Sequence, residues 1–182
     1  MLGPLATGDD RLRARLRYHD PRFDHNNYLE EEMNVRNIRL GIYGGLAGGV
    51  VFGAMMGMMG MLPMIGKMAG YPSASFGFFV HMVNSAVIGA GFGVLLGRGI
   101  RRLDNGLTRG LAYGALWWLL GPLTLMPLFM GMGLGVNWSL AAAGNMLPSL
   151  VGHLVYGVIL GTSYAFLKHR LFDSTEALAG AS

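Results

Sequence analysis

The chain contains no cysteine and few charged residues. Without cysteine, its 182 residues can form no disulfide, no thiolate metal site and no cysteine nucleophile. Charged residues make up 13% of the chain, about half of the roughly 25% that is typical of soluble domains. Acidic residues are absent from 33–103 and from 105–172. The composition therefore argues against a soluble globular domain and predicts an all-α integral membrane protein.

Apolar runs of about 20 residues, the length of helix that crosses a bilayer, occur four times. We expect four transmembrane helices in a domain of 36–170, between a polar, basic tail of 1–35 and a short tail of 171–182. Asn27, with Glu30 three positions later, predicts a helix start, and Gly121-Pro122 predicts a kink. The four spans are about 38–62, 76–97, 107–130 and 146–167.

None of these spans contains Asp or Glu. A carboxylate proton relay, a carboxylate di-iron centre and a carboxylate cation site are therefore unsupported. The chain also has no phosphate loop, zinc-protease helix or nucleophile elbow. We therefore expect no catalytic residues and no enzymatic activity.

The positive charges predict how the chain is oriented. Of the 14 Lys and Arg residues, 13 lie in or beside the N-terminal tail, in the central loop or at the C-terminal end, and only Lys67 lies in the other two loops. Because Lys and Arg favour the cytoplasmic side, we expect a protein of the cell (inner) membrane with both termini in the cytoplasm. Basic residues beside apolar runs serve as topology anchors, so we predict no nucleic-acid partner.

Two parts of the membrane domain resemble each other. The tripeptide Gly-Leu-Ala at 45–47 recurs at 110–112, 65 positions later. In the second helix of each hairpin a histidine, His81 or His153, stands eight positions before a glycine. This pattern predicts two helical-hairpin repeats that run parallel, related by an axis along the membrane normal.

Glycines spaced four apart place bare backbone along one helix face and predict close helix packing. We expect them to form a tightly packed bundle; the same surfaces would also suit a homo-oligomer or docking on other membrane subunits. The residues concerned are Gly41, Gly45, Gly49, Gly53, Gly57, Gly89, Gly93, Gly97, Gly110, Gly114, Gly157 and Gly161.

His81 and His153 are the candidate functional residues at membrane depth. At 1.5 Å per helical residue they lie about 25 and 22 Å from the nearest cytoplasmic anchors, Arg98 and Lys168, and so at a similar level. Three uses remain open. The pair could provide both axial ligands of a haem b. It could instead bind copper or another soft-to-borderline metal, or form hydrogen bonds that hold the helices together.

Methionine is concentrated near the same level, with seven residues between 55 and 68. Met56 and Met126 each stand 17 positions beyond an arginine, Arg39 or Arg109, and so reach the depth of the histidines. Thioethers select Cu(I), which makes Met56 and Met126 candidate metal ligands. Methionine also fills irregular gaps between packed helices, so both interpretations stay open.

The segments 110–127 (GLAYGALWWLLGPLTLMP) and 153–161 (HLVYGVILG) resemble a family of small four-span prokaryotic membrane proteins of unknown function. Some members of that family carry a histidine-kinase label, which this chain does not support because it has no room for a kinase domain beside four spans. The resemblance covers about 38–168. It implies the four-span fold and a prokaryotic source, and it implies no activity.

The sequence favours a non-catalytic accessory or structural subunit of a larger membrane complex, such as an electron-transfer complex. A small transporter or channel built from the duplicated hairpin is the alternative. A membrane protein that binds haem or copper through His81 and His153 is a weaker alternative.

Overall fold

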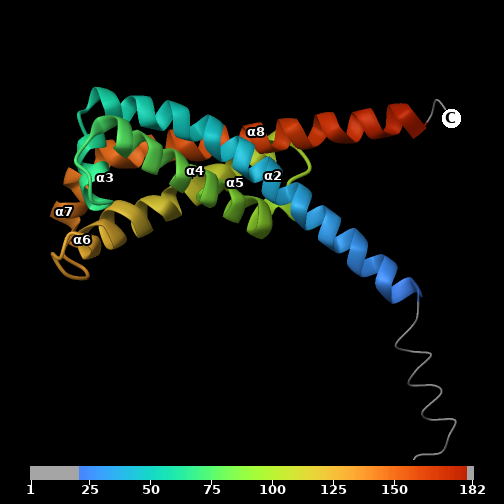
Figure 1. Cartoon of the computed structure of the whole chain (residues 1–182), viewed down its shortest axis with the longest axis horizontal. Coiled ribbons are helices and arrows are strands. Elements are labelled where there is room, and N and C mark those ends of the chain that lie inside the picture. Colours follow the sequence, from blue (N-terminus) through green and yellow to red (C-terminus); the bar gives the residue numbers. More distant parts are fainter. Residues whose placement is uncertain (1–20, 180–182) are drawn as a thin grey trace, which may run out of the picture. The chain divides into compact units, whose positions relative to one another are not determined.

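The computed structural model describes the backbone of residues 21–179 and the side chains of residues 27–170. All regular structure in this part of the chain is helical (Figure 1). Four helical stretches are long and apolar enough to cross a membrane: Asn27–Met58, Ala74–Gly99, Leu103–Phe129 and Leu147–Arg170. The all-α fold with four spans is therefore confirmed, and the chain is a multi-pass membrane protein.

The long helices are interrupted or followed by short elements. In chain order the elements are α2 (Pro21–Met58), α3 (Leu62–Met68), α4 (Ala74–Leu96), the 3₁₀ turn η1 (Gly97–Gly99), α5 (Leu103–Leu120), the π-helical turn η2 (Gly121–Leu125), α6 (Met126–Phe129), α7 (Leu140–Asn145) and α8 (Leu147–Ala179). Figure 1 shows α3, α6 and α7 together at one end of the bundle, which we call the connection end.

Two boundaries differ from those expected. Helix α2 ends at Met58 rather than near Leu62, because Gly60 takes a positive φ of 68° and Leu62 begins the separate helix α3. Helix α2 also begins at Pro21, so the prediction that Asn27 starts a helix is wrong. A proline is well suited to a helix start because the first turn leaves its amide position without an intrahelical partner.

By its internal contacts the chain divides into two compact units, Met1–Arg36 and Asn37–Ser182. All the packing described below lies within the second unit. Glycine brings α2 against α4 there. A Cβ placed on Gly41 would meet the carbonyl oxygen of Gly89, and one on Gly45 would meet that of Ser85. The two backbones therefore touch directly, without intervening side chains.

Helices α5 and α8 meet in the same way. A Cβ on Gly106 would meet the carbonyl oxygen of Gly161, and one on Gly110 would meet that of Gly157. Gly57 is different from the other glycines of its row, because a Cβ there would meet only a methyl group of Leu62, at 3.4 Å. It stands one residue before the end of α2, and among the described residues no other long helix covers it, so within this chain Gly57 brings no two long helices together.

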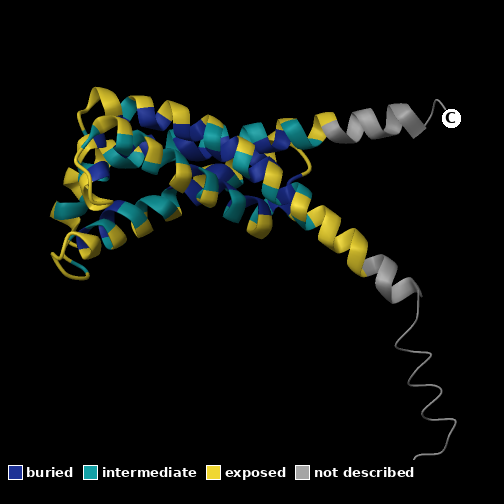
Figure 2. Ribbon diagram, in the orientation of Figure 1, coloured by how far each residue is buried: buried dark blue, intermediate teal, exposed yellow. Residues whose placement is uncertain are grey.

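Large side chains fill the rest of the core. Phe92, Leu160 and Tyr164 are fully buried, and Tyr164 donates a hydrogen bond to Asn37 Oδ1 at 2.7 Å. Tyr156 of α8 donates to the carbonyl oxygen of Ser85 on α4 at 2.9 Å. Figure 2 shows the buried residues along the middle of the bundle.

The outward faces of the long helices are apolar. Large hydrophobic side chains with high exposure occur on all four of them, as in Val50, Val87, Leu119 and Val151. A soluble protein does not normally present so much apolar surface to water. These faces fit the hydrocarbon of a lipid bilayer.

Candidate functional site

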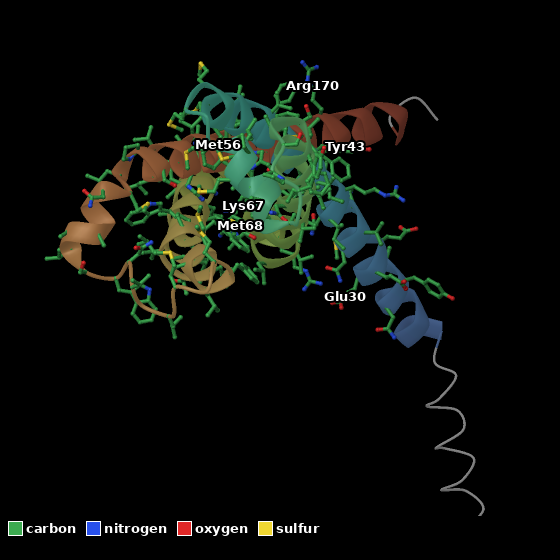
Figure 3. All side chains as sticks on the ribbon, turned by 60° about the vertical axis from the view of Figure 1, so that its left-hand side comes forward. Glu30, Tyr43, Met56, Lys67, Met68 and Arg170 are labelled. Atoms are coloured by element: carbon green, nitrogen blue, oxygen red, sulfur yellow. The ribbon has the colours of Figure 1, made fainter. Side chains whose placement is uncertain are left out.

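A cavity of about 610 Å³ lies toward the connection end of the bundle. Its walls come from all four long helices, from α3, η2 and α6, and from the segment that follows α6. Figure 3 brings this end forward and labels Met56 on α2 and Met68 on α3, which both line the cavity. The size is within the range of pockets that hold small molecules or cofactors.

Methionine and histidine distinguish the lining. Both His81 and His153 line the cavity, as do Met56 and Met126, so the structure brings all four candidate ligands to one space. Nine of the chain's 14 methionines contribute in total: Met56, Met59, Met61, Met64, Met68, Met126, Met130, Met132 and Met146.

His81 connects two helices through the backbone. Its Nε2 lies 2.9 Å from the carbonyl oxygen of Gly49 on α2 and 3.4 Å from Ser85 Oγ. Because a carbonyl oxygen only accepts hydrogen bonds, Nε2 carries the proton and donates it to Gly49. The lone pair is then on Nδ1, which has no hydrogen bond to any side chain or backbone group in the described part of the chain.

His153 is fixed within its own helix. Its Nδ1 donates to the carbonyl oxygen of Ser149, one turn earlier in α8, at 2.7 Å. Nε2 therefore holds the lone pair. That nitrogen faces Gly121, since a Cβ there would lie 3.7 Å from it. Within the described residues Nε2 has no hydrogen-bond partner.

Both imidazoles are in contact with the ring of Phe52. Phe52 packs edge-on against both, with ring centroids 5.5 Å from His81 and 4.8 Å from His153. The histidines form no hydrogen bond with each other among the described residues. The hydrogen bond that His81 makes between helices ends on Gly49, and that of His153 stays within α8.

The kink expected at Pro122 takes the form of the π-helical turn η2. A proline removes one backbone donor and crowds the preceding turn, which leaves carbonyl groups to be satisfied elsewhere. Thr124 Oγ1 donates to the carbonyl oxygen of Leu119 at 2.7 Å, and Asn137 Nδ2 donates to that of Pro122 at 3.2 Å. The turn places Gly121, which has no side chain, opposite His153, and this keeps the space in front of Nε2 open.

The adjacent tryptophans have separate roles. Trp118 donates its indole hydrogen to the carbonyl oxygen of Met146 at 3.1 Å and so ties α5 to the start of α8. Trp117 lines the cavity and packs edge-on against Tyr113, with centroids 6.2 Å apart. Its buried Nε1 has no hydrogen-bond partner in the part of the chain that the structure describes.

Several lining residues were not expected from the sequence. Ser149 stands one turn before His153, a spacing that identifies it in hindsight as the residue whose carbonyl fixes the imidazole. Asn137 lies in an irregular segment, and no periodicity in the sequence connects it with Pro122.

The chemistry of the lining is neutral. It includes no Lys, Arg, Asp or Glu. Among the described residues, no three or more His, Cys, Asp or Glu come close enough together to hold a metal ion. The polar atoms that remain for a ligand are imidazole nitrogens, thioether sulfurs, and a few amides and hydroxyls.

Comparison of the chain with models of known protein families, with curated protein sequences and with solved structures finds no match. The resemblance to the four-span family therefore rests on the segments 110–127 and 153–161 alone. A function has to be argued from the cavity.

Proposed function

We propose that this protein is a non-catalytic membrane protein whose cavity binds a small ligand or cofactor, and that it works as the binding subunit of a larger membrane complex. The observation that carries the proposal is the cavity of about 610 Å³ lined by His81, His153 and nine methionines. Apolar walls with a few convergent polar atoms are typical of ligand sites.

The glycine contacts support a scaffold that holds this cavity open. The pairs Gly41–Gly89 and Gly106–Gly161 occupy corresponding places in the two helical hairpins. We propose that the hairpins are duplicated and that glycine packing fixes each one. Helices whose backbones are already in contact at the glycines cannot approach each other more closely. The larger side chains toward the connection end therefore enclose the cavity instead of filling it.

The neutral lining favours a binding role over transport of a hard ion or a charged metabolite. Membrane transporters hold such substrates with charged side chains or with the ends of broken helices. The cavity lining contains no charged side chain. The apolar outer faces of the helices, such as those at Val87 and Leu119, also offer surface for contact with other membrane subunits.

A filled cavity tests the proposal. In Gly121→Leu, the new side chain enters the space in front of His153, because a Cβ at Gly121 has no neighbour closer than 3.7 Å. The protein is purified from native membranes in mild detergent and studied by native mass spectrometry. We expect the wild type to retain a bound non-protein mass and Gly121→Leu to lose it.

Gly144→Leu provides the matched control, because a Cβ at Gly144 meets nothing within 4 Å and this glycine is not part of the cavity wall. We expect this variant to retain the ligand like the wild type. A wild type without any bound mass, or equal retention by Gly121→Leu, would contradict the proposal.

A further inference from the structure

We infer that the ligand of this cavity is a soft monovalent metal ion, Cu(I), bound by the imidazole of His153 and by thioether sulfurs of the cavity methionines. The inference rests on the proposed function and names the ligand class of that same site. Three features of the structure support it. The imidazole of His153 has its tautomer fixed by a hydrogen bond, methionines of both hairpins line the cavity, and the lining has no charged side chain.

The imidazole of His153 has the arrangement found in metal-binding histidines. Such a histidine almost always donates its second ring hydrogen to a carbonyl or carboxylate, which fixes the tautomer and the ring orientation. The bond from Nδ1 to the carbonyl oxygen of Ser149, 2.7 Å long, does this. The lone pair of Nε2 is left facing the open side of Gly121.

Thioether ligands approach the cavity from both hairpins. Met56 of α2 is 5% exposed and lines the cavity from the first hairpin, while Met126 lines it from the second. Thioethers and imidazole together suit Cu(I), whereas hard cations such as Ca²⁺ and Mg²⁺ need oxygen ligands.

The absence of charged side chains from the lining favours a monovalent ion over a divalent one. Burying an uncompensated charge costs free energy that rises steeply with the charge. A divalent ion would bring two charges into a lining without any carboxylate, and no three His, Cys, Asp or Glu gather there or elsewhere in the described chain. A monovalent ion brings one charge, and the rings of Phe52 and Trp117 in the cavity wall can stabilise it through cation–π contact.

Haem fits the site less well. His81 uses its Nε2 for the hydrogen bond to the carbonyl oxygen of Gly49, and Phe52 packs against both imidazole rings. The lining also has no Lys or Arg to pair with the two propionates of a haem.

The test measures Cu(I) binding by the purified full-length protein in detergent. Cu(I) is supplied directly, without oxygen, in competition with the chromogenic chelator bicinchoninate. We expect the double variant Met56→Leu/Met126→Leu and the single variant His153→Ala each to bind Cu(I) about tenfold or more weakly than the wild type, because changes even to the outer-shell partners of metal ligands cost about 10–100-fold in affinity.

Matched controls make the same chemical changes outside the cavity. Met33 and Met58 are exposed and do not line it, so Met33→Leu/Met58→Leu should bind Cu(I) like the wild type. His169 on α8 is also outside the lining, and His169→Ala should likewise have no effect. Equal affinity in the cavity variants and in these controls would overturn the inference.

X-ray absorption at the copper edge supplies a measurement that needs no variant. We expect a coordination shell that contains sulfur together with at least one nitrogen. A shell of nitrogen and oxygen alone, or a Soret band in the protein as isolated from native membranes, would overturn the Cu(I) assignment.

Failure of the inference is distinguishable from failure of the proposed function. If the wild type binds no Cu(I) but retains another ligand that Gly121→Leu loses, the copper assignment is wrong and the binding function stands. If the wild type binds neither Cu(I) nor any other ligand, both are wrong.

Discussion

At the scale of single residues, the two candidate histidines perform different tasks. His81 reaches from α4 to the carbonyl oxygen of Gly49 on α2, so its hydrogen bond joins two helices. His153 bonds one turn back along its own helix, to Ser149. Both rings face the same cavity and pack against Phe52. Their similar place in the sequence therefore does not make them equivalent in the structure.

This difference predicts unequal losses of stability. We expect His81→Ala to lower the free energy of unfolding by about 1 kcal/mol more than His153→Ala, because only His81 holds two helices together. Both truncations enlarge the same cavity, so the packing loss is similar and the difference reports the hydrogen bond. Reversible denaturation in detergent measures it, with His169→Ala as an exposed control. Equal losses in the two variants would show that the bond to Gly49 contributes nothing.

At the scale of elements, α2 meets α4 and α5 meets α8 at glycine residues. The spacing of four predicts one face on α2, yet the members of that row have different neighbours. Gly45 meets the backbone of α4, whereas Gly57 meets only the side chain of Leu62. Periodicity identifies the face but not the place where the partner helix ends. That place depends on the break after Met58, where Gly60 takes a positive φ; Pro63 marks the start of α3 in the sequence but does not show where α2 ends.

Gly57 therefore serves as a control for the other glycines of its row on α2. Gly45→Ala and Gly110→Ala should each destabilise the protein by about 1–3 kcal/mol, since even one methyl group forces two backbones apart. Gly57→Ala should be neutral or stabilising by up to about 1 kcal/mol, because alanine favours the helix more than glycine and its Cβ fits there. Thermal unfolding in detergent compares the three variants. A loss at Gly57 as large as that at Gly45 would mean that helix packing does not cause the difference.

The four spans could be predicted from the sequence because hydrophobic runs of this length report directly on the bilayer. The shared level of His81 and His153 also follows from the constant rise of a helix. The cavity could not be predicted. It depends on the π-helical turn at Pro122, on the bond from Asn137 to that turn, and on the packing of Phe52 against both histidines. These are contacts between segments far apart in the chain, and no local pattern encodes them.

At the scale of the whole membrane domain, the two ends of the bundle differ in chemistry. At the end opposite the cavity, cations close the C-terminus of α4. Arg109 donates to the carbonyl oxygen of Leu96 at 3.1 Å, and Lys168 donates to that of Gly97 at 2.8 Å. The connection end has the methionine-lined cavity and, among the described residues, only one basic residue, Lys67. A molecule with such different ends has a defined direction in the membrane.

The direction of the bundle in the membrane follows from its positive charges. Basic residues favour the cytoplasm, so we predict that the connection between α4 and α5 is cytoplasmic and that the cavity lies toward the outer surface. The chain has no native cysteine, so single cysteines report without background. Ala69→Cys and Ala141→Cys place exposed thiols at the connection end, and Arg101→Cys places one between α4 and α5. In intact cells an impermeant maleimide should label positions 69 and 141, and it should reach position 101 only after permeabilisation.

Labelling of position 101 alone in intact cells would show that the orientation is the reverse of the predicted one. The cavity would then take its ligand from the cytoplasmic side, and a soft metal ion would have to be delivered to it there.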